Sequence, residues 1–133
     1  MEGVRPRVDT RTKILTAGAV AALQPARPLL LVTGYFDILR AEHARDLAEA
    51  RERTGAQSVL AMVLPLAGEM LPQAARAEMV AALRVVDYVF IADSEDPESL
   101  AGSLQPVETL RLEGADARRT RQLIEHVHRR QSC

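Results

Sequence analysis

The residues with the clearest chemical potential follow a short apolar run in the first third of the chain. Residues 29–33 lead into Gly34, and the next nine residues read Tyr-Phe-Asp-Ile-Leu-Arg-Ala-Glu-His. Gly34 permits a sharp turn and a close approach of the backbone to a ligand. Arg40 and His43 begin a helical pattern, and backbone N–H groups at a helix start attract phosphate together with the helix dipole. A guanidinium is also a good partner for phosphate. The pattern therefore predicts a phosphate-binding loop.

The elements that must hold this loop can be read from the apolar periodicity. We expect strands at 29–33, 58–64, 87–91 and 107–112, and helices at 17–23, 41–54, 73–84, 96–104 and 116–130. Strands that alternate with helices indicate a parallel sheet with right-handed crossovers. The predicted fold class is α/β, a Rossmann-like doubly wound parallel sheet of four or five strands in three α/β/α layers. Ligands of such sheets bind at the carboxyl ends of the strands, where the strand order reverses.

Local signals predict how three of the helices begin, end or pack. Thr16 is a suitable cap for the first helix, and Gly55 follows the helix that begins at Ala41. In the last helix the apolar residues Leu123, Ile124 and Val127 recur at helical spacing, so we expect them to face the core.

Composition bounds the class of protein. The 133 residues fit one domain, which we expect at 13–133 behind a flexible tail at 1–12. A formal net charge of −1 gives no electrostatic case for nucleic acid or an anionic membrane, and no apolar stretch is long enough to span a bilayer. The single cysteine, Cys133, excludes an internal disulfide, and the N-terminus lacks the apolar core of a signal peptide. We therefore expect a cytoplasmic protein.

The loop at 31–43 resembles the signature of the cytidylyltransferase-like nucleotidyltransferases, a strand followed by G-x-F-D-x-x-H-x-G-H at a helix N-terminus. The similarity is to adenylyltransferase domains acting on heptose phosphates and to glycerol-phosphate cytidylyltransferases. Residues 76–83 and 86–89 resemble a later helix and strand of that group, and residues 119–124 are weakly similar to its closing S-T-T-x-I-I segment. The resemblance covers most of the chain and implies a nucleotidyltransferase type of fold.

The resemblance implies a reaction and a set of residues. The family transfers a nucleotide monophosphate from ATP or CTP to a small phosphorylated or alcohol acceptor, usually with Mg²⁺, and stabilises the departing pyrophosphate. His43 and Arg40 occupy the positions of its two catalytic histidines. The implied nucleotide and phosphate contacts are Thr33, Gly34, Tyr35, Phe36, Asp37, Arg76, Arg119 and Thr120. The acceptor itself is not indicated by any residue.

Two departures from the signature leave two hypotheses open. Arg40 replaces the first histidine, and Glu42 replaces the glycine that leaves room for the nucleotide. A carboxylate about 4 Å from a phosphate charge costs roughly 1 kcal/mol in bulk water and about four times more near a protein surface. The chain is therefore either an active enzyme or an inactive relative that acts as a nucleotide-binding or assembly module. We expect a homodimer in the second case, and no metal-ligand cluster is visible in the sequence.

Most of the candidate residues also have a purely structural interpretation. Gly34 could serve only as a turn at a strand end, and Phe36 could belong to the core. Asp37 could orient the loop, and His43 could be hydrogen-bonded locally at the helix start. Arg76 could be an exposed arginine at the start of a helix, and the arginines of the last helix could form a solvated face.

Overall fold

Two apolar runs form the centre of the sheet. Strands β2 (Leu29–Gly34) and β3 (Ser58–Val63) are buried at all six positions. They pair in parallel from Leu29 opposite Ser58 to Gly34 opposite Val63. Strands that are covered on both faces need continuous apolar sequence, which explains the uninterrupted pattern of these runs. The computed structural model describes residues 9–93 and 98–131.

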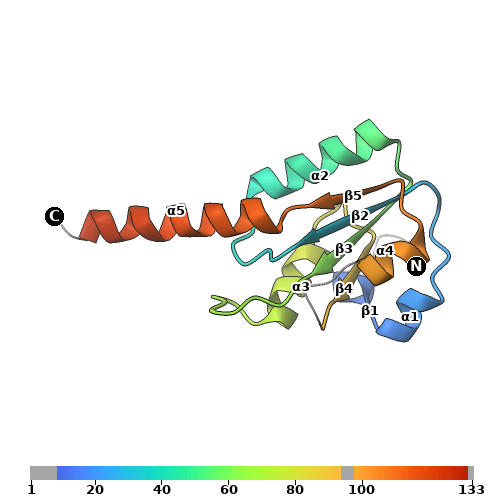
Figure 1. Ribbon diagram of the computed structural model, residues 1–133, viewed down its shortest axis with the longest axis horizontal. Helices are drawn as coiled ribbons and strands as arrows, with labels where there is room; N and C mark the ends of the chain where they lie inside the picture. The colour runs from blue at the N-terminus through green and yellow to red at the C-terminus, as the bar shows by residue number, and fades with distance from the viewer. Residues whose placement is uncertain (1–8, 94–97, 132–133) are drawn as a thin grey trace, which may run out of the picture.

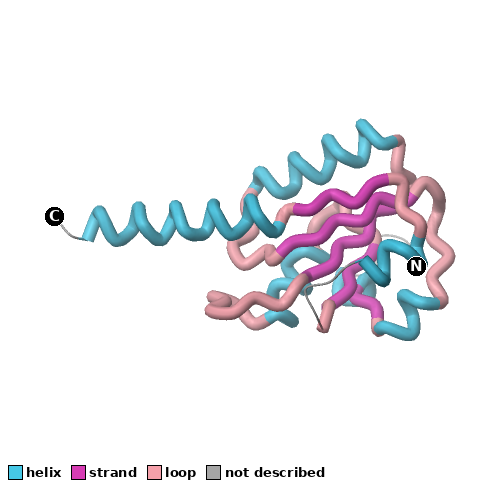
Figure 2. Tube along the Cα trace, in the orientation of Figure 1, coloured by secondary structure: helices cyan, strands magenta, loops and turns pink. Residues whose placement is uncertain are grey.

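Three shorter strands complete a parallel sheet of five strands, which Figure 2 shows in magenta. They are β1 (Ile14–Leu15), β4 (Tyr88–Ile91) and β5 (Glu108–Arg111), and the strand order is β1-β4-β3-β2-β5. This confirms the expected α/β class. Strand β1 was not predicted, because two residues are too few to show a periodic pattern.

Five α-helices accompany the sheet in the described residues: α1 (Ala17–Ala21), α2 (Ala41–Thr54), α3 (Gln73–Ala81), α4 (Glu98–Leu104) and α5 (Glu113–Gln131). Alternate residues of a strand point to opposite faces, so each central strand contributes to two apolar layers. Helices α2 and α3 pack on the face formed by Leu30, Val32, Val59, Ala61 and Val63. Helices α1 and α4 contribute Val20 and Leu104 to the other face, with Leu29, Leu31, Leu60 and Met62.

A 3-10 helix, η1 (Thr10–Lys13), overlaps the end of the stretch 1–12 that we expect to be a tail. Its start is capped by Asp9, whose carboxylate accepts a hydrogen bond from the Arg11 backbone N–H at 3.0 Å. The arginine side chain also bonds this carboxylate, which lowers the pKa of Asp9.

Helix α5 departs from the expectation that it packs on the core. It leaves the body along the line of β5 and projects away from it (Figure 1). Residues 121–130 are all exposed, including Leu123 at 36%, Ile124 at 39% and Val127 at 43%. The prediction that these side chains face inward is wrong, because an amphipathic pattern does not say whether the covering surface belongs to the same chain. Among the described residues, no helix combines the length and apolar character needed to cross a membrane.

Two local signals are confirmed. The Thr16 hydroxyl accepts a hydrogen bond from the Ala19 backbone N–H at 3.1 Å, which caps α1 as predicted. Gly55 ends α2 in the left-handed conformation with a φ of 68°. A residue with a side chain is strained at this φ, whatever the free space around it.

The two glycines of these helices give a matched test. We expect Gly55→Ala to lower the free energy of unfolding by about 1–2 kcal/mol, because alanine must hold a left-handed φ. We expect Gly18→Ala, inside α1, to raise it by roughly 0.5–1 kcal/mol, because alanine favours a helix. No neighbouring atom lies within 4 Å of a Cβ added at either glycine, so steric contact does not confound the comparison. Chemical denaturation measures both changes, and shifts of the same sign would contradict the left-handed cap.

Candidate functional site

The switch point of the sheet lies between β2 and β5. The chain builds β2, β3 and β4 outwards in one direction and then returns to place β5 on the other side of β2. Thr33 lies opposite Arg111 in this pairing, so the two strands end at the same edge. The loop after β2, the start of α2 and the start of α5 meet there (Figure 1). This is the edge where ligands of doubly wound sheets bind.

A carboxylate lies at this switch point. The fully buried Thr33 donates a hydrogen bond from Oγ1 to Oε2 of Glu113 at 2.8 Å. The Thr33 carbonyl accepts from the Leu112 backbone N–H, also at 2.8 Å, so the segment carrying Glu113 is held against β2. Glu113 is the first residue of α5, where the helix dipole favours negative charge. The expected residue Thr33 is therefore at the site, but its hydroxyl bonds to a group of the protein.

Sequence reasoning missed Glu113 and its neighbour Arg111. Both lie at the carboxyl end of the last strand, and that position was the signal that could have identified them. Arg111 ends β5 and forms an ion pair with Glu98 at the start of α4. The switch point therefore carries both charge signs, contributed by β5 and α5.

The turn after β2 is formed by Phe36 and not by Gly34. Gly34 is the last residue of β2, and its carbonyl accepts a hydrogen bond from the Leu64 backbone N–H at 2.9 Å. Phe36 has a φ of 52°, a left-handed conformation that costs about 1–2 kcal/mol for a residue with a side chain. Its ring is fully buried in the core and lies 5.8 Å from the ring of His43, measured between centroids. Burial of the ring offsets this strain, so the loop is formed without a ligand.

His43 locks the start of α2. Its side chain is 1% exposed and lies on the buried stripe of the helix with Leu47 and Ala50. Nδ1 accepts a hydrogen bond from the Arg40 backbone N–H at 3.0 Å, and the His43 backbone N–H donates to the Arg40 carbonyl at 3.0 Å. Because Nδ1 accepts, a neutral ring carries its proton on Nε2. Arg40 and Glu42, beside it in the same turn, are both half-buried.

Asp37 holds the loop that follows β3. Its carboxylate is 4% exposed and accepts hydrogen bonds from the backbone N–H groups of Met70, at 2.9 and 3.1 Å, and Leu71, at 3.1 Å. These bonds agree with the interpretation of Asp37 as a residue that orients a loop. A contact between Asp37 and a substrate stays a prediction.

Arg76 is fully buried, so the interpretation as an exposed arginine at a helix start is wrong, and its contact with phosphate stays a prediction. Nη1 donates to the carbonyls of Tyr35, at 2.6 Å, and Leu64, at 2.9 Å. Nε donates to the carbonyl of Leu71 at 3.2 Å, and Nη2 bonds the carboxylate of Glu69 at 2.6 Å. These bonds use four of the five N–H donors of the guanidinium. Arg76 is therefore a structural link between the loops after β2 and β3.

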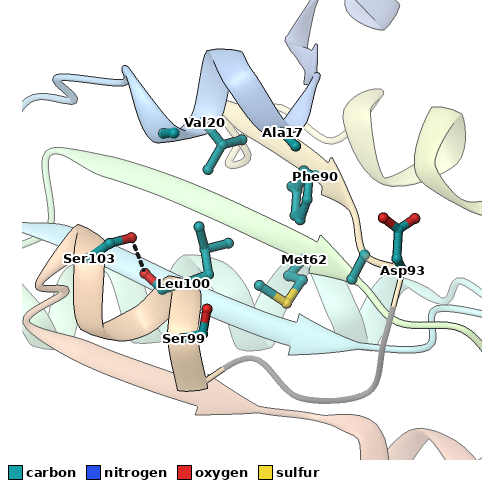
Figure 3. A pocket seen from close by; sticks show the side chains of 10 residues that line it. Ala17, Val20, Met62, Phe90, Asp93, Ser99, Leu100 and Ser103 are labelled. Atoms are coloured by element: carbon teal, nitrogen blue, oxygen red, sulfur yellow. Dashed lines mark hydrogen bonds between the residues drawn. The ribbon is translucent and has the colours of Figure 1, made fainter.

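A hollow of about 360 Å³ opens on the face of the sheet that α1 and α4 cover (Figure 3). Val20, Met62, Phe90 and Leu100 give it an apolar wall, and Asp93 lies at its rim. The remaining lining residues are Ala17, Ala21, Ala92, Ser99 and Ser103. None of these residues is basic, so the hollow suits an uncharged group and not a phosphate.

The sequence is similar to proteins named bifunctional protein HldE. The chain is 37% identical to a bifunctional protein HldE of Campylobacter curvus over 123 residues, which cover 84% of this chain and 26% of that protein. It is 34% identical to the HldE of Geobacter sulfurreducens over 109 residues, or 74% of this chain and 22% of the relative. The chain is a relative of the HldE proteins. It spans about a quarter of the length of these relatives.

The fold comparison agrees with this relationship. A lipopolysaccharide core biosynthesis protein from Thermoplasma volcanium superposes with a TM-score of 0.53 at 20% identity, over 59% of this chain and 68% of that protein. The HldE relationship and this fold fit the cytidylyltransferase-like family that the loop resembles. No protein-family profile matches the chain.

The single lysine of the chain lies away from the switch point, and two residues expected near phosphate cannot be placed. Lys13 bonds the carbonyls of Leu83, at 3.1 Å, and Val86, at 2.7 Å, just before β1 and so at the opposite edge of the sheet. Arg119 and Thr120 belong to α5, but their side chains lie outside the described part of the structure. Their contact with phosphate stays a prediction.

A role for Mg²⁺ stays a prediction, because proteins usually hold this ion through one or two carboxylates together with the phosphates of the nucleotide. Within residues 9–93 and 98–131, no group of three or more His, Cys, Asp or Glu side chains could hold a metal ion. The Asp37 carboxylate is engaged by two backbone N–H groups and the Glu113 carboxylate by Thr33.

The buried guanidinium gives a stability test. We expect Arg76→Met to lower the free energy of unfolding by about 3–5 kcal/mol. The variant leaves four acceptors, among them the Glu69 carboxylate, without the hydrogen bonds that the guanidinium donates. Arg76→Lys is also destabilising, since one ammonium cannot reach all four. The control is Arg84→Met on an exposed side chain, with an expected change within about 0.5 kcal/mol. Equal urea midpoints for Arg76→Met and the control would contradict the structural role.

Proposed function

We propose that the chain is a nucleotidyltransferase-like domain that binds ATP or CTP weakly and keeps its own carboxylate where phosphate would approach. The relationship to the HldE proteins and the shared fold support the nucleotidyltransferase-like role. The single observation that carries the rest is the hydrogen bond between Thr33 and Glu113 at the switch point.

The argument for nucleotide binding rests on the start of α2. This helix has 14 residues, and the positive end of its dipole lies beside the turn after β2. Arg40 supplies a guanidinium there, and its N–H groups suit the oxygens of a phosphate. Because the turn at Phe36 is already formed, binding does not require the loop to be ordered first.

The argument for weak binding rests on two carboxylates. Glu113 lies at the switch point, and Glu42 lies in the first turn of α2. A carboxylate about 4 Å from a phosphate charge costs between roughly 1 and 4 kcal/mol, depending on exposure. One such contact therefore lowers affinity by about fivefold to several-hundredfold. Nucleotide binding must either displace these side chains or tolerate them.

The reaction, where it occurs, is nucleotidyl transfer. An acceptor oxygen attacks the α-phosphorus, and the bond from that phosphorus to the pyrophosphate oxygen breaks. Arg40 would hold the phosphates and stabilise the charge on the departing pyrophosphate, and His43 would act on them by fixing the start of α2 that carries Arg40. The hollow beside Met62 and Phe90 would take an uncharged part of the acceptor or the nucleotide.

The inactive alternative has support of its own. The exposed apolar side chains of α5 favour a role in assembly, because a folded domain in water usually covers such a stripe. Binding of nucleotide without release of pyrophosphate, with any acceptor, would agree with this alternative.

Isothermal titration of ATP and CTP with Mg²⁺ tests the proposal. We expect weak binding to the wild-type chain and at least about fivefold tighter binding to Glu113→Gln, because the amide keeps an acceptor for Thr33 and removes the charge. Glu125→Gln, on an exposed position of the same helix, is the matched control and is expected to leave the affinity unchanged.

A second variant tests the signature itself. Arg40→His combined with Glu42→Gly restores the family pattern and is expected to tighten binding further, with pyrophosphate release as the readout of transfer. If no variant binds ATP or CTP at millimolar concentration, the nucleotide-binding proposal is wrong. If Glu113→Gln and Glu125→Gln act alike, the role given to Glu113 is wrong.

A further inference from the structure

The outer half of α5, residues 121–131, has no support from the body of the protein. The whole helix has 19 residues and is therefore about 28 Å long, close to the width of a small domain. Residues 121–130 are exposed on every side. An isolated helix shorter than about 12–15 residues is marginal in water, so this arm needs a surface to pack against.

The arm has one apolar side with basic neighbours. Leu123, Ile124 and Val127 share a side of the helix and are the large apolar residues exposed there. By helical spacing, Arg121 and Arg130 flank this stripe on its two sides. The arm therefore suits a groove with an apolar floor and an acidic rim.

The body of the protein contains such a groove. It has a volume of about 220 Å³ and runs between α2 and β5, the edge strand of the sheet. Ala50, Leu110 and Leu112 form its apolar part, and Asp46 and Glu49 supply carboxylates. Among the described residues, no strand pairs with the outer edge of β5. Natural proteins commonly cover such an edge, since an exposed strand edge invites unwanted pairing.

We propose that a second copy of this chain occupies the groove, so that each α5 arm lies against α2 and β5 of the other copy. The basic flanks of the arm then face Asp46 and Glu49, and Leu123, Ile124 and Val127 face the apolar floor. The occupant is a second copy because the arm of this chain carries the apolar side chains and arginines that suit the apolar floor and the carboxylates of the groove. The arm leaves from the carboxyl end of that strand (Figure 1).

Two-fold symmetry doubles the area that the arm–groove contact buries. A two-fold dimer uses the same patch on both subunits, so a single arm–groove contact occurs twice. That doubling matters because stable protein interfaces bury about 1,200–2,000 Å² in total. Arg53 also lines the groove, and its Nη1 and Nη2 bond the Glu108 carboxylate at 2.9 and 2.7 Å. This pairing lowers the pKa of Glu108.

The arm is tested by a matched pair of variants in the whole chain. Sedimentation equilibrium over a range of concentrations measures the dimer dissociation constant, and we expect Ile124→Glu to raise it at least about tenfold. Gln122→Glu places the same charge two residues away, on the opposite side of the helix, and is expected to leave the constant within about threefold. A wild-type chain that stays monomeric at every concentration, or equal effects of the two variants, would overturn the proposal.

The groove is tested separately. Glu49→Arg changes a residue that lines the groove, and Glu52→Arg makes the same change on the same helix at an exposed residue outside it. We expect only Glu49→Arg to weaken the dimer, and Arg121→Glu combined with it to recover part of the loss. If Ile124→Glu dissociates the dimer but Glu49→Arg has no effect, the arms meet a different surface and the proposal is wrong. Circular dichroism of each variant confirms that the body remains folded.

Discussion

The buried guanidinium of Arg76 is the constraint on which the functional edge of the sheet depends. A charge without water must find several acceptors, and Arg76 finds them in the loop after β2, the end of β3 and the loop that precedes α3. Tyr35 is 41 residues from Arg76 in the sequence, so this side chain ties the loop after β2 to the segment between β3 and α3. Gln73, one turn earlier, donates to the carbonyls of Val63 and Ala92 and ties the ends of β3 and β4 in the same way.

The buried polar side chains near this edge form their hydrogen bonds with other parts of the protein. Asp37, Phe36 and His43 are all buried. Asp37 and His43 accept hydrogen bonds from backbone N–H groups, and the Phe36 ring lies near the His43 ring. Binding sites for phosphate usually leave backbone and side-chain donors facing the ligand. Here a carboxylate, Glu113, lies at the switch point and bonds a buried hydroxyl. A phosphate at the switch point, as we propose, would meet this negative charge.

The sequence could predict the elements better than the use of individual side chains. Continuous apolar runs and the signals at Thr16 and Gly55 depend on nearby residues, so the central strands and the ends of α1 and α2 follow from local pattern. The burial of Arg76 and the position of Glu113 depend on contacts across 41 and 80 residues of sequence, which no local pattern reveals. The stripe of α5 shows a third kind of limit. Its periodicity is real, but the surface that covers it need not belong to the same chain.

Glu113 joins the two proposals, since it is both the carboxylate at the switch point and the first residue of the arm. A nucleotide that displaces this carboxylate from Thr33 acts on the root of α5. Seating the arm on a second copy restrains the direction of the same helix. If both events occur, their free energies are coupled, and linkage requires that dimer formation alter nucleotide affinity by the same factor as nucleotide alters dimer stability. A seated arm that holds Glu113 against Thr33 keeps the carboxylate at the switch point, so the dimer then binds nucleotide more weakly than the monomer.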